Sequence, residues 1–393
     1  MSKEVFVLSA ARSAVGGFGG SLSGIEPAEL AADVMKAAIE RSSVPAAEYE
    51  FVTAGTVIPT ESRFAYVARV ASIKAGLPME SVAMAVNRLC SSGLQAIVSS
   101  AQAILLGDAE LAIGGGVEVM SRGAYLSTAM RSGARMGDTA LIDSMVATLT
   151  DPFGVGHMGV TAENLAEKWK ITREEQDALA AESHRRAASA REAGKFKDEI
   201  VPITLKSRKG ETIFDADEHI RPETTAEILG KMRPAFKKDG TVTAGNASGI
   251  NDGASFFTLA SGEAVRARGL SPMARLVSYA IAGVPNDLMG EGPIPASKKA
   301  LLKAGLKLSE IDVIESNEAF AAQALAVQKA LELDPAKTNV NGGAIALGHP
   351  IGASGAVIAT KALYELRRVG GRYALVTMCI GGGQGIAAIF ERV

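Results

Sequence analysis

Apolar residues follow two patterns along this chain. Continuous apolar runs of strand length occur at VFVLSAA (5–11), at ELAIGGG (110–116) and at YALVTMCIGGG (373–383), the last two ending in glycines. Such runs are typical of strands buried on both faces. The segment LQAIVSSAQAILL (94–106) instead has helical spacing. Alternating strands and helices of this kind predict an α/β fold with helices covering both faces of a sheet.

Two stretches of the chain resemble each other. Residues 86–118 and 340–385 both begin with Val-Asn and continue through a Ser-Gly turn, a helix-period apolar segment and a strand-like run to Ile-Gly-Gly-Gly. A repeat of this size indicates two duplicated halves, each built as a doubly wound unit. The glycine-rich ends of the strands then mark the edge where ligands tend to bind.

The middle of the chain has a different texture. From about 121 to 250 it is polar, with charged clusters and Gly-, Pro- and Asn-rich loops. One clear helix is predicted there, with Thr172 as its N-cap, Glu175 completing a capping box and Gly194 as its stop. We therefore expect an N-terminal half (1–120 plus 251–270), an inserted loop domain for ligand binding and oligomerisation (121–250), and a C-terminal half (271–393).

Composition narrows the possible functions. The 393 residues exceed what one hydrophobic core supports, and 47% hydrophobic residues with a net charge of −2 describe a soluble protein without a field suited to nucleic acid or membranes. No signal-peptide pattern opens the chain, and only two cysteines occur, which favours a reducing, cytoplasmic location. Neither a zinc-ligand spacing nor a P-loop or dinucleotide fingerprint is present, so no metal or cofactor is expected.

The two cysteines are the first candidates for chemistry. Cys90, in NRLCSSG, is predicted to lie at the turn between a buried strand and a helix. There the helix N-terminus should lower its pKa and favour the nucleophilic thiolate. Cys379, in VTMCIGGGQG, is the second thiol, and a disulfide between the two is the alternative.

Three further residues stand in small-residue motifs. His349, in GHPIGASG, could accept the thiol proton of Cys90 and later donate an N–H to an oxyanion, although a lone histidine is usually structural. Gly381 could offer a backbone N–H where a ligand approaches closely. Asn317, in NEAFAAQ, is either the N-cap of a helix or an amide that holds a water.

Six motifs together identify the chain as resembling the thiolases, in particular acetyl-CoA acetyltransferases and short-chain β-ketothiolases. They are NRLCSSGLQAI, GHMGVTAEN, TAGNASGINDGA, NEAFAAQ, GHPIGASG and VTMCIGGGQG. The resemblance implies a five-layered α/β/α/β/α fold assembled as a homotetramer. It also implies a ping-pong reaction on acetyl-CoA, CoA and 3-ketoacyl-CoA, in which coenzyme A thioesters are substrates.

The resemblance assigns roles to these residues. Cys90 would be the acylated nucleophile, His349 its activator and Cys379 the acid/base that moves the α-proton. His349 with a water on Asn317 would form one oxyanion hole, and the N–H groups of Cys90 and Gly381 the other. Along the CoA tunnel the resemblance places His157, Met158, Arg221, Phe236, Ala244, Ser248, Met289, Ala319 and Phe320.

The acyl end of the tunnel shows one departure from the family pattern. Glu291 stands between two glycines where thiolases more often carry a neutral residue, and a buried carboxylate there would be costly unless paired. Met158 and Met289 are long enough to occupy the space of a longer acyl chain, so we expect a short acyl pocket.

Three alternatives stay open at this point. A degradative 3-ketoacyl-CoA thiolase would accept a broader range of chain lengths. A decarboxylating condensing enzyme shares the duplicated fold but typically has a single cysteine, so Cys379 argues against it. A non-catalytic acyl-CoA binding protein of the same fold would be free to lose the nucleophile, which is present here.

Overall fold

The computed structural model describes residues 4–207 and 210–393. Most of its strands join in one mixed sheet along the path β13-β14-β15-β12-β1-β11-β5-β3-β4, while β9 pairs with β10 and β6 with β7 in two separate small sheets. The two halves of this path meet where β1 pairs with β12 over only two residue pairs, Phe6 with Arg275 and Val7 with Ala274. Each half therefore forms its own unit of the sheet.

The first half contains β1 (Val5–Ser13), α1 (Pro27–Ser42), β3 (Phe51–Gly55), α2 (Val67–Lys74), β4 (Val82–Val86), α3 (Ser92–Leu106), β5 (Leu111–Val119) and β11 (Asn251–Ser261). The second half contains β12 (Ala274–Gly283), α9 (Pro293–Ala304), β13 (Val313–Ser316), α10 (Ala321–Leu331), α12 (Ile351–Arg368), β14 (Tyr373–Ile380) and β15 (Gln384–Arg392). Reading outward from the junction, the strands of the first half follow the order β1, β11, β5, β3 and β4. The second half has the matching order β12, β15, β14 and β13, with an isolated bridge at Thr338 in the position of β4. The duplication inferred from sequence is confirmed by this topology.

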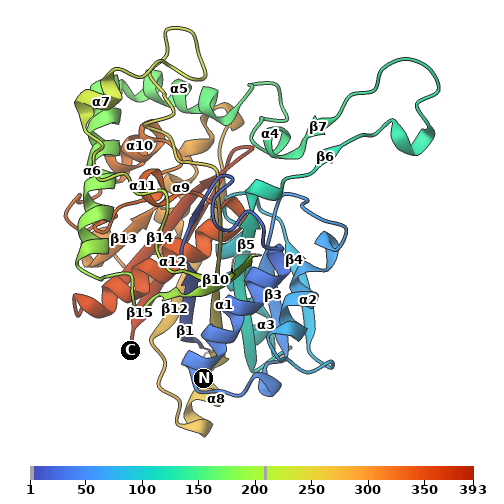
Figure 1. Ribbon diagram of the computed structural model, residues 1–393. Helices are drawn as coiled ribbons and strands as arrows, with labels where there is room; N and C mark the ends of the chain where they lie inside the picture. The colour runs from blue at the N-terminus through green and yellow to red at the C-terminus, as the bar shows by residue number, and fades with distance from the viewer. Residues whose placement is uncertain (1–3, 208–209) are drawn as a thin grey trace.

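The helices form three layers around the two halves of the sheet (Figure 1). α1 and α2 cover the outer face of the first half, α9 packs on the second half, and α3 and α12 lie side by side between them. Separate buried clusters fill each interface, around Val34 and Phe256, around Ile97 and Phe390, and around Leu375 and Ile389. The predicted five-layered α/β/α/β/α fold is confirmed.

The two central helices touch through glycine. A Cβ atom on Gly93 of α3 would lie 3.0 Å from the Ala353 carbonyl of α12, and one on Gly355 would lie 2.6 Å from the Leu94 nitrogen. Any larger side chain would push the helices apart, which explains the repeated Ser-Gly pair. The stretch Leu89–Leu106, which contains α3, is long and apolar enough to cross a membrane by length and composition alone. In this protein most of the stretch is buried in the core.

The segment from 121 to 250 leaves and rejoins the first half between β5 and β11. Its elements are β6 (Tyr125–Leu126), β7 (Ile142–Asp143), α4 (Ser144–Thr148), α5 (Met158–Trp169), α6 (Arg173–Glu192), β8 (Ile200–Val201), β9 (Ile203–Ser207), β10 (Gly210–Phe214) and α7 (Ala226–Gly230). α6 has the predicted capping box of Thr172 and Glu175. Gly194 follows its end with a positive φ of 69°.

A buried ion network ties this segment to the first strand. Arg12 of β1 is fully buried and lies 2.8 Å from Glu199 and 2.8 Å from Asp217. Removing either carboxylate would leave a buried guanidinium with incomplete compensation, which typically costs several kcal/mol. The inserted segment is thus held rigidly against the sheet on which the candidate site is built.

Candidate active site

The turn from β4 to α3 carries Cys90, as the sequence predicts, but β4 is an exposed edge strand and not the buried strand that was expected. Leu89, one residue earlier, has a positive φ of 48°, a strained conformation for a residue with a large side chain. Its N–H donates to the Asn87 Oδ1 at 2.9 Å, and this bond holds the turn. The strain fixes the backbone immediately before the thiol.

The expected lowering of the Cys90 pKa is wrong. Burial raises the pKa of this thiol to about 11, although hydrogen bonds from the backbone N–H groups of Gly381 and Cys90 lower it in part. The first N–H groups of the helix are already engaged, because Ser91 donates to the Arg88 carbonyl and Ser92 to the Leu89 carbonyl. Desolvation therefore outweighs the helix N-terminus, and the free protein holds a neutral thiol.

The end of β14 brings the second thiol and Gly381 to the same place. Gly381 lies against the Cys90 turn, since a Cβ on it would meet the Leu89 side chain at 3.2 Å. Cys379 is fully buried, and burial together with the nearby Cys90 raises its pKa well above the usual range. Both cysteines are free thiols, so the disulfide alternative is excluded.

His349 stands in the loop before α12, and its backbone is clamped by a buried amide. The Asn251 Oδ1 accepts the His349 N–H at 2.9 Å, while the Asn251 Nδ2 donates to the Gly16 carbonyl at 3.0 Å. Gly348 has a φ of 104°, and a Cβ there would lie 2.4 Å from the Asn251 Cγ. Only glycine fits this close approach, which explains the Gly-His pair.

The imidazole of His349 has one occupied and one unoccupied nitrogen. Its Nδ1 lies 2.6 Å from the Ser354 Oγ, and the Ser354 hydroxyl donates to the Pro350 carbonyl at 2.8 Å. A hydroxyl that donates its only hydrogen elsewhere must accept, so Nδ1 carries the proton. Nε2 is then a free base, buried without a partner among the described residues, and burial lowers the pKa of His349 to about 4.

Asn317 presents a second set of unpartnered polar atoms. It lies between β13 and α10, and its side-chain oxygen and nitrogen are both buried with no hydrogen bond to any described residue. α10 begins at Ala321 with Phe320 at the N-cap position, so the N-cap alternative for Asn317 is wrong. Buried polar groups without a partner are rare and costly, and they indicate groups kept for a ligand or a bound water.

Sequence reasoning missed Glu118, a carboxylate that organises the site. It is fully buried at the end of β5 and accepts N–H bonds from Val57 at 3.0 Å, Ile58 at 3.2 Å and Gly352 at 2.9 Å. Burial raises its pKa to about 8 against these donors, and its charge raises the pKa of Cys90. A glutamate inside an otherwise apolar strand run was the available signal.

Most of the residues expected along the CoA tunnel meet at Cys379. Met158, Met289, Ala319, Phe320 and Phe236 share one apolar cluster with this thiol. The His157 ring stacks on Phe236 with centroids 4.8 Å apart, and the Phe236 ring meets Phe320 edge-on at 6.0 Å. The Ser248 N–H donates to the Ala319 carbonyl at 3.0 Å, so the loop before β11 borders the same cluster.

The other two expected residues, Arg221 and Ala244, line a separate cavity of about 230 Å³. Ala247 belongs both to this cavity and to the Cys379 cluster, so the two regions are contiguous. His184 and His219 also line it, with ring centroids 6.4 Å apart, and sequence reasoning did not select them. Their pKa values are lowered by burial, that of His184 to about 4, so both rings are neutral at pH 7.

Glu291 is not a carboxylate of the acyl pocket. Its oxygens accept from the Trp169 Nε1 at 2.7 Å and lie 2.7 Å from the Lys168 Nζ. It therefore points to the end of α5, while its neighbour Met289 is buried beside Cys379. The expected conflict does not arise, because the carboxylate is paired.

Family models match the chain over most of its length. Residues 5–263 match the thiolase N-terminal domain and residues 270–392 match the thiolase C-terminal domain. The chain belongs to the thiolase family. Thiolases are acyltransferases, and this chain is an enzyme of that class.

Named relatives cover the chain completely. It is 58% identical to a protein named Beta-ketothiolase BktB of Cupriavidus necator and 50% identical to an acetyl-CoA acetyltransferase of Paracoccus denitrificans, over 100% of each chain. Among solved structures, the acetyl-CoA acetyltransferase of Bacillus anthracis superimposes with a TM-score of 0.97 at 45% identity, covering 100% of this thiolase and 99% of that chain. Human mitochondrial 3-ketoacyl-CoA thiolase in complex with CoA gives a TM-score of 0.96 at 46% identity, covering 100% and 98%.

Proposed function

We propose that this thiolase joins two molecules of acetyl-CoA into acetoacetyl-CoA and free CoA, and catalyses the reverse cleavage of short-chain 3-ketoacyl-CoA. One observation carries the proposal. Two free thiols, Cys90 and Cys379, lie near each other at the Gly381 backbone, and His349 and Asn317 each keep buried polar atoms that have no partner among the described residues. A two-step acyl transfer needs a nucleophile, a second acid/base and two sets of oxyanion donors, and this arrangement offers each of them.

In the first step, the His349 Nε2 takes the Cys90 proton as the sulfur attacks the thioester carbonyl. The backbone N–H groups of Cys90 and Gly381 point at the Cys90 sulfur. When this sulfur attacks, the carbonyl oxygen of the thioester becomes an oxyanion close by, and the same N–H groups would stabilise it. The Cys379 thiol gives its proton to the sulfur of the leaving CoA, and Cys379 is then the thiolate that serves as the base of the second step. The acyl group stays on Cys90 as a thioester.

In the second step, Cys379 removes the α-proton of a second acetyl-CoA, and the resulting carbanion attacks the acyl group on Cys90. The α-proton of a thioester is weakly acidic, so a base of raised pKa matches it better than an ordinary thiolate. The enolate oxygen would be held by Nε2–H of His349 and by a water on Asn317. The new carbon–carbon bond releases the Cys90 thiolate, which recovers its proton.

Incubation with acetyl-CoA alone tests the proposal. Intact mass and peptide mapping should show one acetyl group on Cys90 that is lost when CoA is added. The Cys90→Ala variant should form no adduct. A folded, CoA-binding protein that forms no adduct would instead favour a non-catalytic binding protein.

We propose a preference for short acyl chains. Met158 and Met289 both pack in the cluster of Cys379, and the Met158 sulfur would lie 3.6 Å from a Cβ on Gly381. Their side chains take the space that a longer chain would need. Turnover of acetoacetyl-CoA should exceed that of six- and eight-carbon 3-ketoacyl-CoA, whereas equal or higher rates on the longer substrates would favour the broader degradative thiolase.

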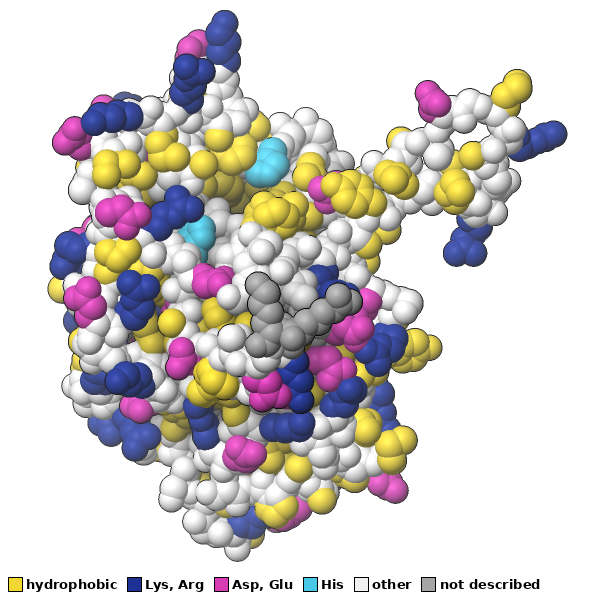
Figure 2. All heavy atoms as spheres, in the orientation of Figure 1, with side chains coloured by type: hydrophobic (Ala, Val, Ile, Leu, Met, Phe, Trp, Pro, Cys, Tyr) yellow, Lys and Arg dark blue, Asp and Glu magenta, His cyan; other side chains and the backbone are white. Residues whose placement is uncertain are grey.

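We also propose assembly as a homotetramer. The hairpin of β6 and β7 stands away from the body of the protein (Figures 1 and 2) and exposes apolar side chains, among them Met136 at 98% and Leu141 at 65%. The edge strand β4 likewise exposes Val82 and Met84. Exposed apolar side chains on an arm and on a sheet edge are typical of interaction surfaces. Light scattering should give four chains per particle, and Met136→Asp should reduce that number.

A further inference from the structure

A cavity of about 940 Å³ lies away from the candidate active site. Six segments line it: β1, the end of α1, the loop before β8 that carries Asp198, the loop before β12, the end of α12 and the end of β15. None of the residues assigned to the reaction or to the CoA tunnel is among its lining. Its size is at the upper end of the range for sites that enclose a small organic ligand.

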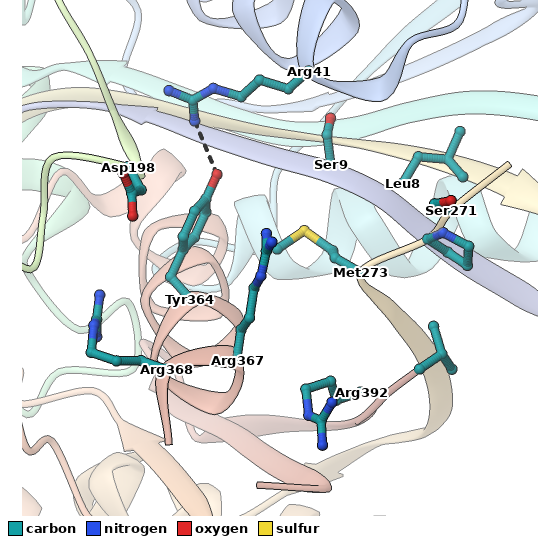
Figure 3. A pocket seen from close by; sticks show the side chains of 12 residues that line it. Leu8, Ser9, Arg41, Asp198, Ser271, Met273, Tyr364, Arg367, Arg368 and Arg392 are labelled. Carbon is teal, nitrogen blue, oxygen red and sulfur yellow. Dashed lines mark hydrogen bonds between the residues drawn. The ribbon is translucent and has the colours of Figure 1, made fainter. Parts of the chain in front are cut away.

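Arginine side chains from separate elements line this cavity (Figure 3). Arg41 comes from α1, Arg367 and Arg368 from the last turn of α12, and Arg392 from β15. Basic residues in the last turn of a helix are favoured by the helix dipole, which accounts for the pair on α12. The same preference accounts for Arg41, which lies in the last turn of α1, but not for Arg392 on strand β15.

Three of these arginines have no carboxylate partner among the described residues. Arg41 donates to the carbonyls of Ala10, Glu199 and Ile200 and to the Tyr364 hydroxyl. Arg392 donates only to the carbonyls of Gly370 and Gly371.

The side chain of Arg367 has no hydrogen bond or ion pair with a described residue, and Figure 3 shows it reaching past Met273 toward the centre of the view. Arg368, by contrast, is paired with Glu365. Asp198 is the carboxylate side chain of the lining.

Carbonyl oxygens orient a guanidinium but do not neutralise it, so three positive charges face one cavity that is also lined by the Asp198 carboxylate and by Val393, whose main-chain carboxylate ends the printed sequence. Like charges brought together repel unless an anion lies between them. Arginine is the side chain best suited to phosphate, because its planar fork forms two parallel hydrogen bonds with two oxygens. The charge therefore favours a ligand with more than one phosphate group.

The remaining lining is apolar and aromatic. Leu8, Pro272 and Met273 form one wall, and Tyr364 adds a ring whose hydroxyl bonds to Arg41 and to the Ala10 carbonyl. A bare phosphate would leave most of this volume and all of this wall unused. An organic group joined to the phosphates would fill it.

We propose that this cavity binds a nucleoside di- or triphosphate, with the phosphates on Arg41, Arg367 and Arg392 and the base on the wall of Leu8 and Met273. The site is distinct from the CoA tunnel. It would allow the nucleotide state of the cell to act on this thiolase.

Isothermal titration with ATP and with inorganic triphosphate, at low ionic strength, tests the proposal. We expect one ATP per chain, bound more tightly than triphosphate because the base contributes. Arg367→Glu should weaken ATP binding about 10-fold or more, since it replaces a phosphate donor with a repelling charge. Arg392→Glu should do the same, and Arg367→Gln provides a milder change should either reversal fail to fold.

Two charge reversals serve as matched controls. Arg185→Glu changes an exposed arginine of α6 outside the cavity, and Arg221→Glu changes the cavity beside the CoA tunnel. Neither should weaken ATP binding more than about twofold through general charge effects. Retained acetyl transfer in Arg367→Glu would show an intact fold.

Three results would overturn the proposal. The first is the absence of any heat of binding at millimolar ATP. The second is an equal loss of ATP affinity in Arg367→Glu and in Arg185→Glu. The third is a loss of ATP affinity in Arg221→Glu without such a loss in Arg367→Glu, which would place the nucleotide in the CoA region. Equal affinity for ATP and triphosphate would overturn the role of the apolar wall and leave a polyphosphate site.

Discussion

Replacing Ser354 with alanine tests whether the tautomer of His349 is set by one hydroxyl. Ser354 is 2% exposed, its Oγ lies 2.6 Å from the His349 Nδ1, and the hydroxyl donates to the Pro350 carbonyl. In Ser354→Ala the Nδ1–H loses its acceptor in a buried place. The proton can then move to Nε2, which in the proposed reaction faces the substrate oxygen as its acceptor, and there Nε2 can no longer accept the proton of Cys90.

The size of the effect follows from the cost of a buried donor without a partner, about 1–3 kcal/mol. This cost falls on the reactive tautomer alone, and each 1.4 kcal/mol is a factor of about ten in population. The rate of Cys90 acetylation by acetyl-CoA should therefore fall by about 5- to 150-fold. Rapid quenching followed by intact mass measures that rate, and ¹⁵N NMR of the histidine ring reports the tautomer directly.

Ser278→Ala is the matched control. Ser278 is a buried serine whose Oγ donates to the Ala300 carbonyl at 2.7 Å, far from His349 in the sequence and on a different element. It should lose about 1 kcal/mol of unfolding free energy without a change in acetylation rate. An unchanged rate in Ser354→Ala, or an Nε2–H tautomer in the unmodified enzyme, would refute the reasoning.

Three further predictions concern the other ionisable groups. Cys379→Ser should still be acetylated on Cys90 but should condense very slowly, because a serine hydroxyl is a far weaker acid/base at neutral pH; normal condensation would mean that another group moves the proton. Glu118→Gln places an amide NH₂ against the N–H donors of Val57 and Gly352 and should cost about 2–4 kcal/mol by denaturant unfolding. It also removes a charge that raises the Cys90 pKa, so iodoacetamide should alkylate Cys90 at lower pH than in the unmodified enzyme. His184 has its pKa lowered to about 4 by burial, so its stabilising effect is present above pH 6.5 and is lost toward pH 4. The contribution of His184 to the unfolding free energy is at most about 3 kcal/mol. The His184→Asn variant keeps an acceptor for the Arg221 N–H but does not titrate, so its unfolding free energy should decline less between pH 6.5 and pH 4.

The sequence predicted the fold and the capped helix α6 because these depend on local patterns. Strand-length apolar runs, a capping box and repeated Ser-Gly pairs each act within a few residues. The turn that carries Cys90 was likewise predicted from the change of pattern at one point. Structural features that depend on residues close together in the sequence could therefore be predicted without the structure.

The wrong predictions share a different cause. The pKa of Cys90 was inferred from its helix alone, whereas burial by other elements decides its direction. Asn317 looked like a helix cap because the helix start could not be placed to within four residues. Glu291 looked unpaired because its partners Lys168 and Trp169 lie more than 120 residues earlier.

Asn251 and Glu118 show what kind of residue is hidden from a single sequence. Each acts by a hydrogen bond to the backbone of a loop brought close by folding, with Glu118 joining Val57 to Gly352 across almost 300 positions. The chemistry of a carboxylate or an amide is visible in the sequence, but its partner is not. The arginine cavity is hidden for the same reason, since its lining comes from six separated segments.

The pKa shifts also bear on how a resting thiolase avoids side reactions. With the pKa of Cys90 raised and that of His349 lowered, the neutral thiol and neutral imidazole are the stable pair in the free enzyme. A permanent thiolate would react with any electrophile or oxidant that reached it. A neutral pair ionises only when a thioester accepts the sulfur and a nearby N–H group receives the growing negative charge. Burial of Cys90 thus delays its activation until a substrate is bound, and the N–H groups of Gly381 and Cys90 supply the stabilisation that burial withholds from the free thiol.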